Sequence, residues 1–224
     1  MREPALFSLY PTLFHMAEDG SWPSIQERGL LSTTALLDAY GVQGPQRVAI
    51  ESAWRPKKVV LRRRALPDAV IRDQIPLRPD LLEPCLVGGV TVREWYRLIN
   101  GRVFFWPDRR RLQWFLSAKE YRGEPHIVLT MDTRSVVQRH REKITLSQIN
   151  SGSAYPSKST GVAPKRGPST FQPIAEYPFQ YAAELVVEGG IPQVNGLVRS
   201  VERWVAHKSG DEEAIYELLE RIWP

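Results

Sequence analysis

Leu13-Phe14-His15-Met16 is a short apolar segment that carries one histidine. We predict it to be a strand, followed by one helix that Ser21 caps and Gly29 ends. A second apolar segment, Ala182-Ala183-Glu184-Leu185-Val186-Val187, lies near the other end of the chain and carries one acid. We predict this segment to be a strand as well. The fold and the function both depend on whether these two distant strands meet.

The composition is typical of one globular domain spanning residues 1–224. The chain is 42% hydrophobic and contains seven tryptophans, so it has enough apolar surface for its own core. Cys85 is the one cysteine, which excludes an intrachain disulfide and favours a reducing compartment. The sequence shows no secretory leader and no apolar run of about 20 residues. We therefore expect a cytoplasmic protein without a membrane partner.

The net charge of +5 makes the chain modestly basic. Such a charge permits a polyanionic partner without requiring one. The positive residues gather at Arg62-Arg63-Arg64, at Arg109-Arg110-Arg111, and at Lys158 with Lys165-Arg166. Each cluster is either a nucleic-acid contact or an ordinary solvated face.

Helical and strand patterns alternate irregularly along the chain. We predict helices over 33–40, 45–54 and 91–99, a helix after Asp108, and a terminal helix after Asp211 with Ile215, Leu218, Leu219 and Ile222 on one face. The pattern Ser/Thr/Asp-x-x-Glu predicts capping boxes at Asp80–Glu83 and Thr91–Glu94. Further strands are expected within 57–63, 102–106, 126–131, 143–146 and 197–205, and an irregular segment over 150–172. This order lacks a βαβ rhythm and favours an α+β fold.

Several kinds of chemistry have no motif in this sequence. No P-loop, no Gly-x-Gly-x-x-Gly run and no Gly-x-Ser-x-Gly elbow is present. Cys85 lacks a second thiol for a zinc-finger site, and the four histidines show no metal-ligand spacing. We therefore expect no metal site.

Three short segments resemble the ADP-ribosyltransferase fold. Leu13-Phe14-His15, with the following helix and Gly29-Leu30-Leu31, resembles the first NAD-binding segment of such proteins, above all the DarT-type toxins that modify DNA, and more distantly the RNA 2′-phosphotransferases. Val103-Phe104-Phe105-Trp106, followed by Arg109, resembles the segment with the catalytic arginine of DarT-type enzymes. Ala183-Glu184-Leu185-Val186-Val187, with Gly190-Ile191-Pro192, resembles the strand with their catalytic glutamate.

The sequence also departs from that family. The DarT-type arginine precedes a Ser-Pro pair, whereas Arg109 precedes Arg110-Arg111. The Ser-Thr-Ser signature of arginine-modifying transferases has no match at Phe104-Phe105-Trp106, which argues against arginine as the acceptor. The whole chain further resembles an uncharacterised bacterial family with the core Asn100–Trp106 and the loop Ile149–Gly152.

The resemblance implies a split, strongly bent β-sheet and an NAD-dependent ADP-ribosyltransferase that acts on DNA or RNA as a toxin or defence effector, with an antitoxin protein as a candidate partner. It implies that Glu184 and Arg109 are catalytic. It also implies that NAD, as substrate, is held by His15, Trp106, Asn150 and Ser151.

Each of these residues also has an ordinary interpretation. A carboxylate in an apolar strand faces solvent, a partner or a site, so Glu184 alone decides nothing. His15 donates a hydrogen bond to a ribose hydroxyl or is a satisfied core histidine, and Trp106 stacks on a ligand ring or packs in the core. Two other functions stay open: an RNA 2′-phosphotransferase-like enzyme, and a non-catalytic nucleic-acid or protein-binding module.

Overall fold

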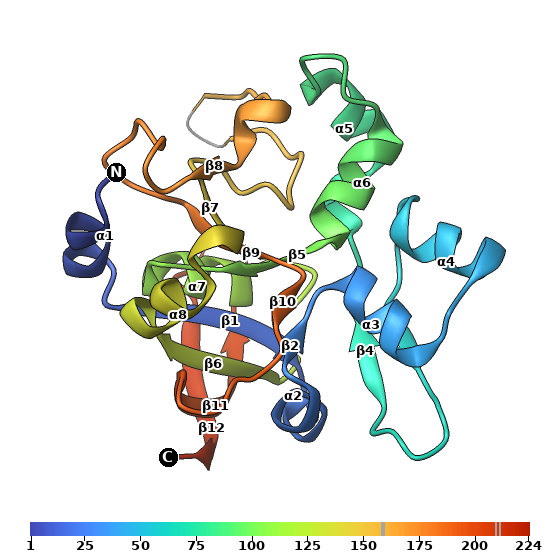
Figure 1. The fold of residues 1–224 in the computed structure, drawn as a ribbon, viewed down its shortest axis with the longest axis vertical. Coiled ribbons are helices and arrows are strands. Elements are labelled where there is room, and N and C mark those ends of the chain that lie inside the picture. The colour runs from blue at the N-terminus through green and yellow to red at the C-terminus, as the bar shows by residue number, and fades with distance from the viewer. Residues whose placement is uncertain (158–159, 209, 211) are drawn as a thin grey trace.

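Two four-stranded antiparallel sheets form the centre of the molecule (Figure 1). The computed structural model describes residues 1–157, 160–208, 210 and 212–224. The first sheet has the order β1 (Thr12–Glu18), β6 (His126–Asp132), β11 (Val198–His207) and β12 (Ile215–Trp223). The second has the order β5 (Arg102–Phe105), β9 (Glu184–Glu188), β7 (Ile144–Ser147) and β8 (Gln172–Pro173). Bent antiparallel sheets with separate helices confirm the predicted α+β class.

The two sheets meet where β1 passes β5. Phe14 and Trp106 form a reciprocal pair of backbone hydrogen bonds, 2.9 and 2.8 Å long. Successive side chains of a strand point to opposite faces, so Leu13 and Ala17 enter the large core between the sheets, whereas Phe14 and Met16 pack on the other side. His15 shares the face of Leu13 and Ala17.

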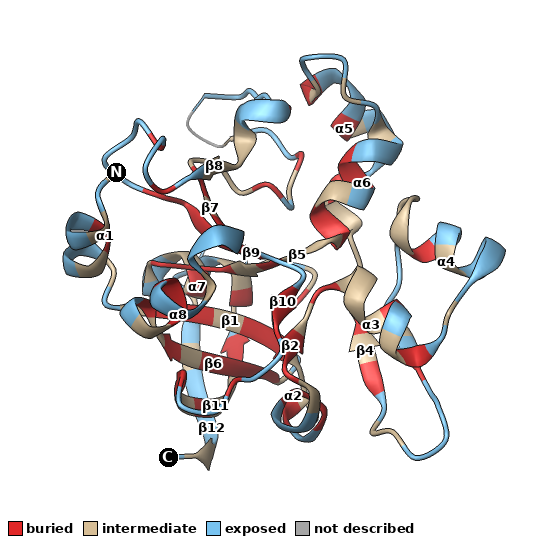
Figure 2. Cartoon of the chain, viewed as in Figure 1, coloured by how far each residue is buried: buried red, intermediate tan, exposed pale blue. Residues whose placement is uncertain are grey.

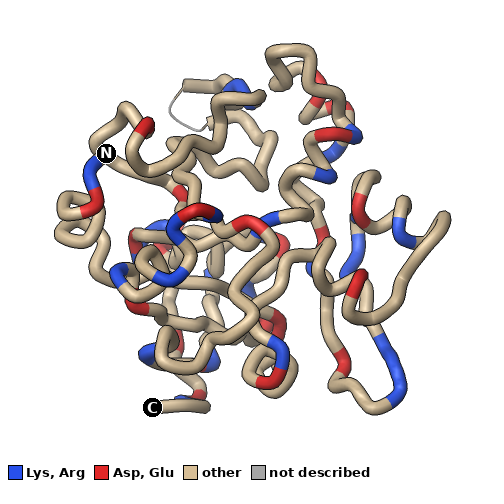
Figure 3. Tube along the Cα trace, viewed as in Figure 1, with Lys and Arg blue, Asp and Glu red and all other residues tan. Residues whose placement is uncertain are grey.

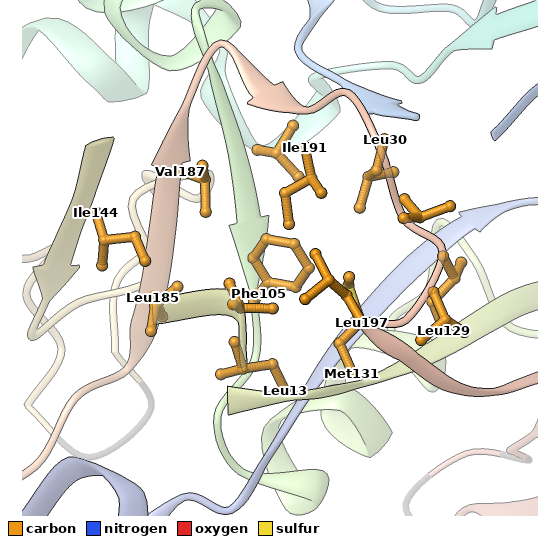
Figure 4. Packing of buried hydrophobic residues seen from close by; sticks show 14 of the residues in the cluster. Leu13, Leu30, Phe105, Leu129, Met131, Ile144, Leu185, Val187, Ile191 and Leu197 are labelled. Atoms are coloured by element: carbon orange, nitrogen blue, oxygen red, sulfur yellow. The ribbon is translucent and has the colours of Figure 1, made fainter. Parts of the chain in front are cut away.

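The core between the sheets is apolar and close-packed. Leu13, Phe105, Leu129, Met131 and Leu185 converge there (Figure 4), each with an exposed fraction of 0%. Most residues of the strands β1, β6 and β9 are accordingly buried (Figure 2). Burial of such side chains contributes on the order of 2 kcal/mol each, so the backbone around the two sheets is held firmly.

A small sheet, β2 (Leu30–Leu31) with β10 (Gly190–Ile191), requires two glycines. Gly29 and Gly190 have φ values of +90° and +107°. A Cβ atom on either residue would lie 2.3 Å from a backbone oxygen, that of Ile191 and that of Leu30 respectively. Only glycine permits this close approach, which ties the segment after β1 to the end of β9.

Four helices lie next to the two large sheets: α1 (Glu3–Leu9), α2 (Trp22–Arg28), α7 (Arg109–Leu116) and α8 (Thr133–His140). The remaining helices, α3 (Thr33–Tyr40), α4 (Gly44–Glu51), α5 (Pro79–Leu82) and α6 (Val92–Asn100), lie to one side with the hairpin β3 (Val59–Leu61)–β4 (Ala69–Ile71) (Figure 1). Short 3₁₀ turns occur at Ile75–Leu77, Glu83–Cys85, Arg141–Lys143 and Pro168–Thr170. Two separate apolar clusters, around Leu37 and around Trp95, hold the side elements.

Several local predictions are confirmed by cap geometry. The helix over 33–40 has the predicted bounds and ends at Gly41, whose φ is +70°. Thr91 and Glu94 form the predicted capping box. Asp108 accepts a hydrogen bond of 2.8 Å from the backbone of Arg110 at the start of α7. These signals depend only on neighbours in the sequence, which explains their success.

Three local predictions were wrong. The expected terminal helix is the strand β12, which pairs along its length with β11, and its expected cap Asp211 lies outside the described residues. The Ser21 side chain does not cap α2 but donates to the backbone oxygen of Glu18. Asp80 and Glu83 form no capping box, because Pro79 already begins the helix and Arg78 precedes it. No helix is predicted from the sequence at the positions of α1 and α8.

Candidate functional site

A cleft of about 450 Å³ lies beside the junction of the two large sheets. Its walls include residues of β1, β5, α7, the segment after β4, the loop after β7 and the first residue of β9, together with residues of α2, β2, α3, β4 and α6. Ligand sites of small molecules have volumes of about 300–1,000 Å³, so the cleft has the size of such a site. The two distant strands β1 and β9 therefore both contribute residues to one cavity.

Glu184 is the buried acid of this cleft. Its side chain has an exposed fraction of 2%. Ser151 donates two hydrogen bonds to it, from the backbone nitrogen to Oε1 at 3.0 Å and from Oγ to Oε2 at 2.7 Å. Burial raises the pKa of Glu184 from 4.5 to about 7, against the opposing effects of Ser151, Arg111 and Arg166. The carboxyl group therefore titrates near neutral pH, as acids and bases in active sites do.

His15 reaches the same cleft from the other sheet. Its Nδ1 lies 2.8 Å from the backbone oxygen of Phe104. A carbonyl oxygen only accepts, so Nδ1 carries the proton in this contact. Burial is the main reason that the pKa of His15 falls from 6.5 to about 4, so the ring is neutral at pH 7. Its Nε2 is then an acceptor, which corrects the expectation that this ring donates to a ribose hydroxyl.

In the structure, Arg111 lines the cleft and Arg109 does not. Arg109 is exposed and lies over the ring of Trp204, 5.4 Å from its centroid, beside a different and much smaller cavity. Two positions of an α-helix are about 200° apart, so residues 109 and 111 point to nearly opposite sides of α7. Arg111 lines the cleft with Trp114 and Phe115, and its charge lowers the pKa of Glu184.

Trp106, Asn150 and Ser151 have three different placements. Trp106 lines the cleft but is 8% exposed and packs on Phe115, with ring centroids 5.3 Å apart. Asn150 also lines the cleft, and its Oδ1 accepts a hydrogen bond of 3.1 Å from the backbone of Gly152. Ser151 is fully buried and is not part of the cleft wall. Ser151 therefore positions Glu184 from behind the cleft wall, and its expected contact with NAD stays a prediction.

The basic clusters of the sequence are largely occupied with local contacts. Arg62-Arg63-Arg64 lies at the turn between β3 and β4 (Figure 3), where Arg62 pairs with Asp68 and Arg63 donates to the backbone of Ala39. Lys165 donates to the backbone of Pro84, and Arg166 is buried with an exposed fraction of 1%. Lys158 lies outside the described residues. The buried Arg166 cannot belong to a surface for nucleic acid.

Sequence reasoning missed Arg72, another arginine of the cleft. Arg72 follows β4 directly, and the apolar run Ala69–Ile71 ending in a charged pair was the signal that could have identified it. Among the described residues, no group of three or more His, Cys, Asp or Glu side chains could hold a metal ion. In the same part of the chain, no helix is long and apolar enough to cross a membrane.

The arrangement suits chemistry at a sugar hydroxyl or an anomeric carbon. A carboxyl group with a pKa near 7 can accept a proton or stabilise a positive charge. A neutral imidazole with a fixed tautomer can accept a hydrogen bond from a hydroxyl. Both groups are oriented by contacts with the protein, which keeps them in place before a ligand arrives.

Comparison with known proteins identifies a family but no activity. No curated protein and no solved structure matches the chain. One family model matches residues 11–198, which include His15, Arg72, Arg111, Ser151 and Glu184. The chain belongs to DUF7002, a family of unknown function.

Proposed function

We propose that this protein is an NAD-dependent ADP-ribosyltransferase that acts on nucleic acid, as a toxin or defence effector. One observation carries the proposal: His15 and Glu184, from opposite ends of the chain and from different sheets, line one cleft. The resemblance of their two strands to the ADP-ribosyltransferase segments requires such a convergence. An ordinary core histidine and a surface glutamate would not produce it.

The hydrogen-bond acceptors of the cleft fit the ribose next to nicotinamide. His15 Nε2 is an acceptor for one ribose hydroxyl, because Nδ1 already donates to Phe104. The carboxyl group of Glu184 is a second acceptor and, when ionised, carries a negative charge. Trp106, Trp114 and Phe115 supply flat apolar surface for an aromatic ring. Such a mixture of apolar walls and a few fixed polar groups is typical of cofactor and nucleotide sites.

The reaction breaks the bond between C1′ of the ribose and the nicotinamide nitrogen. The bonding electron pair leaves with nicotinamide, and positive charge develops on the ribose. Ionised Glu184 stabilises that charge. The acceptor oxygen or nitrogen then bonds to C1′, and its proton passes to the Glu184 carboxylate. Arg111 favours the ionised form of Glu184 before this step.

The acceptor class rests on the resemblance and on the surroundings of the cleft. Trp114 and Tyr155 line the cleft and are 61% and 41% exposed, so both rings are accessible for stacking on a base. Arg110 lies over Trp114, 5.8 Å from the ring centroid, and adds positive charge there. An antitoxin protein that covers the cleft would be the natural partner of such a toxin.

Turnover of NAD tests the proposal directly. The wild-type protein is incubated with NAD, with and without single-stranded DNA or RNA, and release of nicotinamide is measured. We expect release that Glu184→Gln lowers by about two to three orders of magnitude, whereas Glu188→Gln, at the exposed end of the same strand, leaves it unchanged. Equal activity of Glu184→Gln and wild type would disprove the catalytic assignment. Absence of any turnover would favour the binding-module interpretation.

A further inference from the structure

Arg72 has an unusual environment in the wall of the cleft. Its guanidinium carbon lies 4.3 Å from the ring centroid of Tyr121 and 5.7 Å from that of Phe115. Contacts with two aromatic rings restrict the orientation of the guanidinium plane. Among the described residues, the side chain is therefore held beside the cleft by stacking and forms no ion pair.

None of the three guanidinium nitrogens of Arg72 has a hydrogen-bond partner within the described residues, although all three are buried. The neighbouring Arg55 shows the contrast. Arg55 also lines the cleft, and its nitrogens donate to the backbone of Arg72, to the backbone of Ile50 and to Asn100. Buried arginines are expected to be satisfied as Arg55 is, because an unpaired buried charge is costly. Arg72 therefore lacks an acceptor.

Glu18 is one internal alternative to an external acceptor. It lines the same cleft, and both Glu18 and Arg72 influence the pKa of His126. Its Oε1 already accepts from Lys58 at 2.7 Å, and its Oε2 is buried without a partner. No ion pair between Glu18 and Arg72 is present among the described residues. An internal ion pair would couple the stability of the protein to both Glu18 and Arg72, whereas an external ligand would couple its binding to Arg72.

We propose that Arg72 is an anion-binding residue of the cleft and takes the phosphate oxygens of a small phosphorylated ligand. The planar fork of a guanidinium matches two phosphate oxygens at once, which makes arginine the preferred residue for such groups. In the proposed NAD reaction, the group bound would be the diphosphate of NAD, and this identification alone rests on the proposed function.

The burial of Arg72 limits the size of the ligand. Because its nitrogens are buried, an anion reaches them only by entering the cleft, with a small turn of the guanidinium within its aromatic stack. A phosphate or diphosphate at the end or in the middle of a small molecule can do this. The backbone of a long nucleic-acid strand, which must pass over the outside of the protein, is not expected to reach Arg72.

Calorimetric titration with inorganic pyrophosphate tests the site on the full-length protein. We expect saturable binding by the wild type, and a dissociation constant about 10- to 100-fold weaker for Arg72→Gln, the loss expected for hydrogen bonds to a charged group. Arg72→Lys, which keeps the charge but loses the fork, is expected to fall between the two. Arg109→Gln is the matched control, because Arg109 also lies over an aromatic ring but outside the cleft. It should bind pyrophosphate as the wild type does.

Two further ligands identify the source of the phosphate. Binding of ADP-ribose should weaken in Arg72→Gln as binding of pyrophosphate does. An oligonucleotide without terminal phosphates should bind equally to the wild type and to Arg72→Gln. If only binding of the oligonucleotide depends on Arg72, the proposal of a small-ligand site is wrong.

Other outcomes would also overturn the inference. Wild-type protein that shows no saturable binding of pyrophosphate, or an Arg72→Gln variant that binds it unchanged, would do so. The wild type could also fail to bind the anion while Glu18→Gln and Arg72→Gln each lose stability by amounts that do not add in the double variant. That result would identify an internal ion pair between Glu18 and Arg72 instead. Failure of the NAD reaction is distinguishable from these results, because pyrophosphate binding is measured without NAD.

Discussion

Replacement of Glu184 by glutamine is expected to stabilise the protein at alkaline pH while removing its activity. The buried carboxyl group has a pKa of about 7 in the folded protein, against an ordinary value of 4.5. A raised pKa means that the folded state binds the proton more tightly than the unfolded state. The contribution of Glu184 to stability is therefore full below about pH 4.5 and is lost as the pH rises through 7.

The size of this loss follows from the pKa difference. One pKa unit corresponds to about 1.36 kcal/mol, so the ionisation of Glu184 lowers the free energy of unfolding by roughly 3 kcal/mol between pH 4.5 and pH 8. Glutamine has the same shape and does not ionise. The difference in unfolding free energy, variant minus wild type, should thus increase by about 3 kcal/mol over this range.

Urea unfolding followed by tryptophan fluorescence measures this difference at pH 5 and at pH 8.5. Changes in the two hydrogen bonds from Ser151 add a similar offset at both pH values, and His15 is present in both proteins, so the change with pH isolates Glu184. Glu188→Gln, on the exposed end of β9, is the control and should show no such change. A difference between Glu184→Gln and wild type that stays constant with pH would refute the burial argument.

Four other predictions test separate parts of the structure. Arg111→Gln should lower NAD turnover and raise the pKa of Glu184 further, whereas Arg109→Gln should leave turnover unchanged, as a nicotinamide-release assay can determine. Ser151→Ala removes the Oγ donor to Glu184 and should lower turnover through a higher pKa, seen as a shift of the pH–rate profile to higher pH. His15 should stay neutral until about pH 4 in an NMR titration, and its contribution to stability, present above pH 6.5, should disappear as the pH falls through 4. Gly190→Ala should destabilise the protein by about 2–4 kcal/mol in chemical unfolding, because its Cβ would meet the backbone of Leu30, whereas Gly189→Ala, with open space around it, should cost about 1 kcal/mol.

The sequence predicted local structure well where the signal lay in neighbouring residues. Thr91 and Glu94 satisfy each other at the start of α6, and Gly41 ends α3, so both boundaries follow from the chain alone. The strand β12 failed because its apolar residues, Leu218 and Leu219 among them, have a spacing that also suits a helix. Pairing with β11 decided the outcome, and an irregularity of register between Arg203 and Trp204 interrupts the alternation that would have revealed a strand.

The candidate site was predictable in part for the same reason. His15 and Glu184 were identifiable because each is a polar residue within an apolar strand. Arg111 was recoverable from helical spacing, since α7 presents residues 111, 114 and 115 to the cleft and residues 109, 112, 113 and 116 to its other side. The contribution of Ser151 and the exposed state of Trp114 depend on how distant segments fold together. No local pattern contains that information.

The buried acid, the neutral imidazole and the unpaired arginine of the cleft share one physical property. Each is a polar group whose charge is disfavoured by burial or left without a partner: burial raises the pKa of Glu184 and lowers the pKa of His15, and the guanidinium nitrogens of Arg72 lack acceptors among the described residues. Stability alone would favour apolar residues of similar size at these positions. A ligand with hydroxyl groups, a developing positive charge and phosphate oxygens would satisfy all three residues together. Their combined cost to the free protein is therefore most simply explained by a ligand of that composition.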